Sequence, residues 1–174
     1  MKRAGLLDLN EAVQNPGKHL DFSIETHLPQ EEDLDLVAPI TGELTAVSTG
    51  NALLINATFK TRCVLECARC AEPIEVDVEF EMEDDFAVEG VPACYGSDGY
   101  AHIEPDEDGL FEKNALVPDA YIRQGLLVSL PNQPLCSFGW EGDCPNARNL
   151  LSSSNTGGHP ALQILEQFRT REDS

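Results

Sequence analysis

Only 11 lysines and arginines stand against 31 aspartates and glutamates in this chain of 174 residues, which gives a formal net charge of −20. The basic residues are scattered and form no cluster. Such a chain repels a phosphate backbone at long range, so we expect no direct binding to naked RNA and a basic protein as the better-matched partner. Keeping the protein soluble is an equally good explanation of the acidity.

The chain also lacks a long apolar run. Its apolar stretches, such as 52–55 and 125–128, are far shorter than the ~20 residues that span a bilayer. Asp8, Asn10 and Glu11 interrupt the apolar start of the chain, so we expect no export signal and no membrane partner. We therefore predict a cytoplasmic protein, in which cysteines are free thiols or metal ligands rather than structural disulfides.

The common sequence motifs of catalysis are missing as well. The chain has no glycine-rich phosphate loop, no HExxH and no Gly-x-Ser-x-Gly, and its four histidines are dispersed. We predict that the protein is not an enzyme.

Alternation of apolar and polar residues is the clearest pattern that the sequence does contain. It predicts strands over about 20–28, 36–48, 52–65 and 74–82. A turn signal, Thr49-Gly50-Asn51, joins the second strand to the third as a hairpin. We predict an α+β fold, a twisted antiparallel sheet of four to six strands that curls toward a barrel, with one or two packed helices and a C-terminal cysteine-containing loop.

The rest of the chain completes a single predicted domain, residues 1–174. Residues 84–109 are rich in Asp, Glu, Gly and Pro, and we predict a mobile acidic loop there. A helix of about eleven residues should begin at Asp119, with an apolar stripe of Ala120, Leu127 and Val128 and with Tyr121 and Leu126 beside it. Residues 145–158 are predicted to be a flexible linker before a short final helix that starts at 159.

Two cysteines, Cys67 and Cys70, flank Ala-Arg in a turn between two predicted strands. Thiols at this spacing can occupy neighbouring corners of a metal tetrahedron or form a strained redox disulfide. A second pair, Cys136 and Cys144, could complete a closed structural zinc site that clips the C-terminal loop to the sheet, with His159 as a substitute for one thiol. A reduced turn pair without metal, and thiol chemistry aided by the arginine between the thiols, remain alternatives.

The other two cysteines are not candidate ligands. Cys63 falls on the apolar side of its strand and is predicted to be a core thiol. Cys94 lies in the acidic loop and has no predicted role.

Acidic residues line one face of the strand predicted over 74–82. Same-face neighbours on a strand lie about 6.6–7 Å apart, so five carboxylates form a continuous ridge that needs solvent or a basic partner. They look equivalent, unlike a catalytic carboxylate pair, whose environments differ. The candidate partner-binding residues are Glu75, Asp77, Glu79, Glu81 and Glu83.

Several segments, in the same order, resemble the YceD family, also called the large ribosomal RNA subunit accumulation proteins. The early segments are Asn15-Pro-Gly-Lys-His-Leu-Asp-Phe22 and Ile40-Thr-Gly-Glu-Leu44, followed by Cys67-Ala-Arg-Cys70 with an acidic strand and loop after it. Leu127-Val-Ser-Leu-Pro131 and Pro134-Leu-Cys136 resemble the end of the family's helix and the segment after that helix.

The resemblance has one departure near the C-terminus. Cys144 aligns with a cysteine of the relatives, but Ala147 stands where many of them have a further cysteine. The segment 159–165 resembles the family's tail.

The resemblance implies a non-enzymatic factor for large-subunit ribosomal RNA accumulation and ribosome assembly. Together with the charge, it leads us to expect that the protein binds a basic ribosomal protein or an assembly factor on the pre-ribosomal large subunit. Two alternatives remain: a structural zinc-binding interaction module unrelated to ribosomes, and a thiol or zinc enzyme of unknown substrate.

Overall fold

The computed structural model describes residues 5–28, 34–96, 98–105 and 109–147. The chain forms two compact units, Met1–Leu65 with Glu75–Asn132, and Glu66–Ile74 with Gln133–Ser174. The prediction of a single domain over residues 1–174 stays a prediction.

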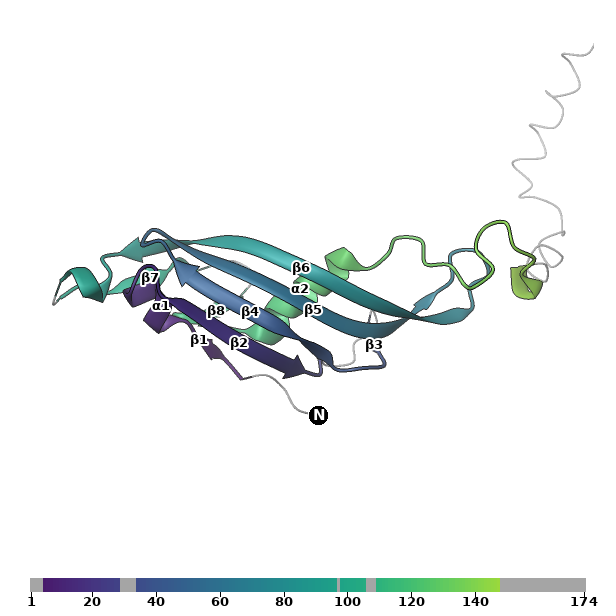
Figure 1. The fold of residues 1–174 in the computed structure, drawn as a ribbon, viewed down its shortest axis with the longest axis horizontal. Coiled ribbons are helices and arrows are strands. Elements are labelled where there is room, and N and C mark those ends of the chain that lie inside the picture. The colour runs from purple at the N-terminus through teal and green to yellow at the C-terminus, as the bar shows by residue number, and fades with distance from the viewer. Residues whose placement is uncertain (1–4, 29–33, 97, 106–108, 148–174) are drawn as a thin grey trace, which may run out of the picture. The chain divides into compact units, whose positions relative to one another are not determined.

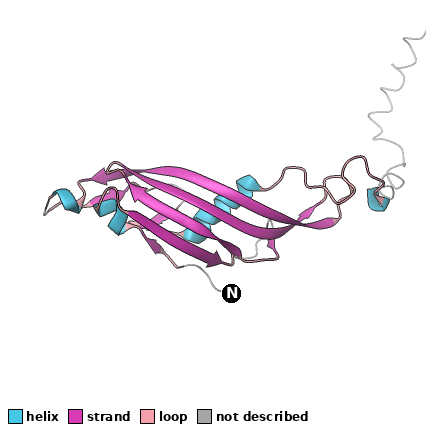
Figure 2. Ribbon diagram, in the orientation of Figure 1, coloured by secondary structure: helices cyan, strands magenta, loops and turns pink. Residues whose placement is uncertain are grey.

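Strands dominate the larger unit (Figures 1 and 2). In chain order the elements are β1 (Leu7–Asp8), α1 (Asn10–Gln14), β2 (His19–Thr26), β3 (Asp35–Leu36), β4 (Ile40–Ser48), β5 (Ala52–Glu66), β6 (Pro73–Gly90), η1 (Ala93–Tyr95), β7 (Ala101–Ile103), β8 (Phe111–Glu112), β9 (Ala115–Leu116) and α2 (Pro118–Ser129). No helix in the described part of the chain is both long enough and apolar enough to cross a membrane.

Six strands form the large antiparallel sheet, in the order β2-β4-β5-β6-β7 with β3 paired to β5. The predicted hairpin between β4 and β5 is present, since Ser48 pairs with Leu53 and the Thr49 N–H donates to the Ala52 carbonyl at 2.8 Å. A small sheet has the order β1-β9-β8. The large sheet twists and curls but stays open, with β2 at one end of the strand order and β7 at the other (Figure 1). The predicted α+β class is confirmed.

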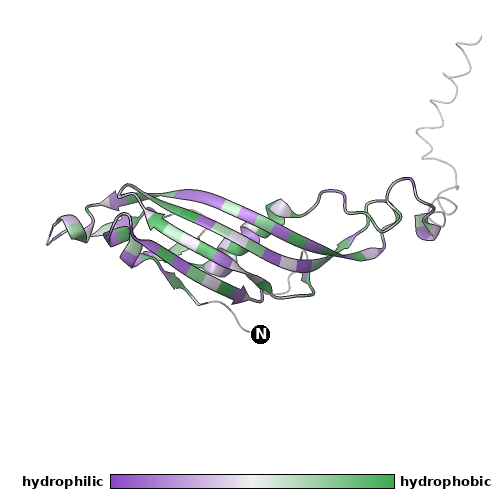
Figure 3. Ribbon diagram, in the orientation of Figure 1, coloured by the Kyte–Doolittle hydropathy of each residue, from purple (hydrophilic) through white to green (hydrophobic). Residues whose placement is uncertain are grey.

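Alternating hydropathy along the strands builds one core beneath the sheet (Figure 3). On β6, Val78, Phe80 and Val88 are buried, whereas their immediate neighbours along the strand are exposed. The Phe80 ring lies 5.6 Å from that of Phe59 on β5, centroid to centroid. Cys63 is completely buried, which confirms its prediction as a core thiol.

Helix α2 packs against this core, with Pro118 in its first turn as expected. The predicted apolar stripe is wrong in part. Tyr121, Ile122 and Leu126 are buried, whereas Val128 is 88% exposed. A Cβ on Gly125 would collide with the Met82 side chain, so glycine allows α2 to approach β6 closely.

The predicted acidic loop begins later than expected. Strand β6 continues through residues 84–90, and β7 pairs with its last three residues. Phe86 and Val88 preserve the two-residue period on the inner face. The loop prediction is therefore wrong over 84–90, where the acidic composition conceals the strand pattern, and over Ala101–Ile103, which form β7. The predicted linker differs too, since residues 145–147 are helical; residues 148–158 and the final helix lie outside the described residues.

A buried polar network ties α1 to β7. The Gln14 side-chain oxygen accepts the N–H groups of Ala93 and Ala101, each at 3.1 Å, and its nitrogen donates to the Ala101 carbonyl at 2.6 Å. Asn114 also donates to the Ala101 carbonyl, at 3.0 Å, and accepts the Ile103 N–H at 3.0 Å. The network satisfies backbone groups at the short strand that ends the sheet.

Candidate metal centre and acidic sheet face

Cys67 and Cys70 lie on a tight turn within the smaller unit. The turn is closed at both ends, because the Cys67 N–H donates to the Glu72 carbonyl and the Ala71 N–H donates to the Cys67 carbonyl, each at 2.9 Å. Ala71 has φ of +56°, in the left-handed region. The backbone reverses here, which directs both thiols to the same side, as expected from the sequence.

The loop with Cys136 and Cys144 is fastened to this turn by two kinds of hydrogen bond. The Ala68 N–H donates to the Pro134 carbonyl at 2.8 Å. The Arg69 guanidinium donates to the carbonyls of Gly139 and Gly142, at 2.8 and 2.7 Å. Arg69 therefore holds the loop between the two cysteines of the second pair, a role that the sequence pattern does not reveal.

The structure brings the candidate thiols together. The Sγ atoms of Cys67, Cys70 and Cys136 all lie within 4.8 Å of one another, and the Cys70 and Cys136 sulfurs are 4.0 Å apart. Cys144 is 2% exposed and belongs to the same buried cluster, but its sulfur is not part of the group of three that lie within 4.8 Å of one another. Ala147 belongs to the same buried cluster. His159 lies outside the described residues.

Backbone N–H groups favour thiolates at two of the four sulfurs. The N–H of Arg69, followed by that of Cys136 at 3.3 Å, lowers the pKa of Cys67 to about 6. The N–H of Ala147 is the main cause that lowers the pKa of Cys144. The Glu72 N–H acts on Cys70 in the same direction, but desolvation and the three neighbouring sulfurs outweigh it and raise the pKa of Cys70 to about 12.

This donor set fits a thiolate-bound metal ion. In a tetrahedral zinc–thiolate site with Zn–S bonds of about 2.3 Å, the sulfurs are about 3.8 Å apart, close to the separation of Cys70 and Cys136. Several sulfurs crowded in a buried place repel one another as thiolates unless a cation neutralises them. All four side chains come from one unit, so binding would close the turn and the loop into one module.

The same burial opposes thiol exchange. Cys67 is 2% exposed and Cys70 is 5% exposed, whereas reactive redox cysteines need an accessible thiolate. The low pKa of Cys67 therefore fits a ligand better than a nucleophile.

The five predicted acidic residues are all exposed on the outer side of β6, but they are not equivalent. Arg62 on β5 binds Asp77 in two hydrogen bonds of 2.7 and 3.2 Å and lies 3.8 Å from Glu75. The hydrogen bond from Arg62 lowers the pKa of Asp77. Sequence pattern alone does not reveal this cation, because its position opposite β6 depends on strand register.

The remaining three carboxylates, Glu79, Glu81 and Glu83, have no ion pair with any described residue. Glu43 on β4 extends this acidic area, since it lines one surface hollow with Glu81 and Glu83 and another with Glu79. Lys60 on β5 also lines the hollow beside Glu79, without an ion pair to it within 4 Å. We refer to Glu43, Glu79, Glu81 and Glu83 as the acidic face.

Comparisons with known proteins find a matching family model and distant relatives. The family model described as large ribosomal RNA subunit accumulation protein YceD matches residues 55–169, more than half of the chain. Uncharacterized proteins of Mycobacterium tuberculosis and Mycobacterium bovis are 26% identical to it over 163 residues, 91% of this chain and 75% of theirs. No solved structure matches the chain. The matched region contains both cysteine pairs and the acidic strand, and the chain belongs to the YceD family.

Proposed function

We propose that this protein supports accumulation of large-subunit ribosomal RNA as a binding factor rather than as an enzyme. In this proposal it binds a basic ribosomal protein or assembly factor on the pre-ribosomal large subunit. Membership of the YceD family supports the link to ribosomal RNA. The mode of action is inferred from charge.

The acidic face carries the proposal. Glu79, Glu81 and Glu83 project from consecutive outward positions of β6, and no described cation pairs with them. Together with the net charge of −20, they form a field that attracts lysine-rich and arginine-rich protein surfaces and repels RNA. The protein would therefore shield a basic partner from RNA until assembly.

A salt titration tests this proposal. Purified protein is immobilised and offered isolated large-subunit ribosomal proteins and, separately, naked ribosomal RNA, from about 50 to about 300 mM salt. We expect at least one basic protein to bind, with affinity falling as salt rises, and RNA to bind far more weakly. RNA binding as tight as any protein binding, with no ribosomal protein retained, contradicts the proposal.

We further propose that Cys67, Cys70, Cys136 and Cys144 hold one structural zinc ion. The spacing of the sulfurs and the N–H groups directed at Cys67 and Cys144 support this assignment. Zinc would supply only folding stability here, by fixing the loop to the turn. Metal analysis of purified protein should find one zinc per chain, and protein that folds fully without metal contradicts the assignment.

The zinc site also favours a second candidate function, a structural zinc module that recruits a partner unrelated to ribosomes. The identity of the bound partner distinguishes the two candidate functions. A partner that binds only when zinc is present and that is not a ribosomal component favours the zinc module.

A further inference from the structure

One edge of strand β6 has no partner strand along most of its length in the described part of the chain. Strand β5 pairs with one side of β6, but β7 pairs with the other side only at residues 88–90. Between residues 75 and 86, no described backbone group outside β5 bonds to β6. β6 forms the upper border of the sheet in Figure 1.

The direction of the free backbone groups follows from two hydrogen bonds at the end of β6. The Val88 N–H donates toward the β5 side, to the Asn51 carbonyl, and the Ala87 carbonyl accepts from Glu104 on the β7 side, both at 2.9 Å. Alternate residues of an antiparallel strand direct both backbone groups to the same side. The backbone groups of Glu79, Glu81 and Glu83 therefore point to the unpaired edge.

An apolar groove runs beside this edge, between β6 and α2. Met82, Phe86, Leu110 and Val128 supply its apolar surface, and Glu81 and Glu83 border it. Its volume is about 480 Å³. The 88% exposure of Val128 leaves an apolar side chain in water at the rim of the groove.

We propose that this edge binds an extended segment of a basic protein partner, which adds to the sheet as a strand beside β6. Side chains of an added strand alternate between the two faces of the sheet. One set would enter the groove over Met82 and Val128, and the other would lie beside Glu79, Glu81 and Glu83 on the outer face. The segment that fits alternates apolar residues with lysine or arginine.

This inference rests on the proposed function, since it names how the basic partner of the acidic face is bound. It adds a requirement that charge attraction alone lacks: the partner must offer backbone hydrogen bonds in register with β6. Charges on an open edge also discourage self-association. A strand with lysines opposite these glutamates can pair with β6, whereas the same acidic edge of another copy is repelled.

The probe is a labelled peptide of about eight alternating lysine and valine residues, titrated into the full protein by fluorescence anisotropy. Two methylated versions separate backbone pairing from charge, one N-methylated at the lysine amides and the other at the valine amides. Only one set of amides can face β6, so one methylated peptide should lose at least about tenfold in affinity and the other should keep it. Equal affinity of the two methylated peptides overturns the proposal.

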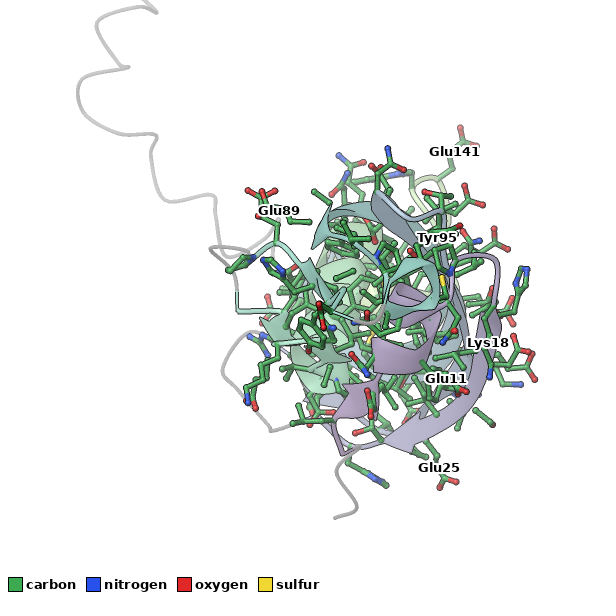
Figure 4. The ribbon with its side chains drawn as sticks, turned by 90° about the vertical axis from the view of Figure 1, so that its left-hand side faces the viewer. Glu11, Lys18, Glu25, Glu89, Tyr95 and Glu141 are labelled. Carbon is green, nitrogen blue, oxygen red and sulfur yellow. The ribbon has the colours of Figure 1, made fainter. Side chains whose placement is uncertain are left out.

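Protein variants locate the peptide. E81K/E83K should weaken binding at least about tenfold, and V128D should weaken it by a similar factor. The charge control is E25K on β2, where Glu25 projects away from the sheet (Figure 4); it is compared with E81K alone, because each of these variants replaces one glutamate by lysine. The apolar control is V91D, at a valine outside the groove that is 55% exposed. A loss in E25K as large as in E81K overturns the assignment to β6.

The two proposals fail differently. If a ribosomal protein binds to wild type but not to E81K/E83K, while the two methylated peptides bind equally well, the acidic face binds the partner but strand addition is wrong. If no basic ribosomal protein binds at all, the proposed function is wrong whatever the peptide does.

Discussion

Replacing Gln14 with alanine should lower the free energy of unfolding by an amount that follows from its buried hydrogen bonds. Gln14 is 7% exposed and bonds to Ala93 and Ala101. In Q14A the Ala93 N–H can turn to water because Ala93 is exposed, and the Ala101 carbonyl retains Asn114. The Ala101 N–H has no such substitute, since Ala101 is completely buried.

One unpaired buried N–H costs about 1–3 kcal/mol, and the lost side-chain packing adds about 1 kcal/mol. We therefore expect Q14A to lower the free energy of unfolding by about 2–4 kcal/mol, a large share of the roughly 5–15 kcal/mol that is typical for a domain. Guanidinium unfolding followed by far-UV circular dichroism measures this change. The matched control is Q124A on the exposed side of α2, which should change stability by less than about 0.5 kcal/mol. A loss below about 1 kcal/mol in Q14A would show that the Ala101 N–H is not left unpaired in the buried interior.

Three further predictions concern the cysteine site and the charged groups. C67S should lose the bound zinc, whereas C94S, at an exposed cysteine, should keep it; metal analysis of both proteins decides, and equal zinc in both contradicts the site. R62A should raise the pKa of Asp77, because Arg62 lowers it in the wild type. The stability that this pair contributes is present above the unfolded pKa of about 4 and is lost as the pH falls through the folded pKa. The difference in unfolding free energy between wild type and R62A should therefore shrink in acid. An unchanged carboxyl titration by NMR would count against the pair. Burial raises the pKa of Tyr121, so the stability that the protonated phenol contributes is complete below the unfolded pKa of about 10 and is lost as the pH rises further. Ultraviolet titration of Y121F against wild type should assign the most alkaline phenol to Tyr121.

Short-range pattern predicted the sheet well where side chains alternate strictly. The period of two along β6 gave the outward acidic residues and the buried Phe80, and glycine at position 50 gave the hairpin. The pattern continued through Phe86 and Val88, but neighbouring acidic residues resembled loop composition. Helical spacing alone did not decide which side of α2 faces the core, and Val128 is exposed rather than packed.

Features that depend on long-range contacts were harder to predict. Arg62 meets Asp77 only because β5 and β6 are neighbours, and Gln14 meets Ala101 across 87 residues. The two cysteine pairs were grouped as candidates from chemistry, but their distance depends on how the second loop folds. Arg69 shapes that loop through hydrogen bonds to backbone carbonyls, which leave no side-chain pattern in the sequence.

The most direct test of the account is site-specific crosslinking on ribosomal particles. A photo-crosslinking residue replaces Glu81 on the acidic face or, as the matched control, Glu25 on β2, and particles that co-sediment with the protein are irradiated. We expect the residue at position 81 to crosslink to a basic protein of the pre-ribosomal large subunit and the residue at position 25 not to crosslink to it. Crosslinks from position 81 to ribosomal RNA alone, or the same protein crosslinked equally from both positions, would contradict it.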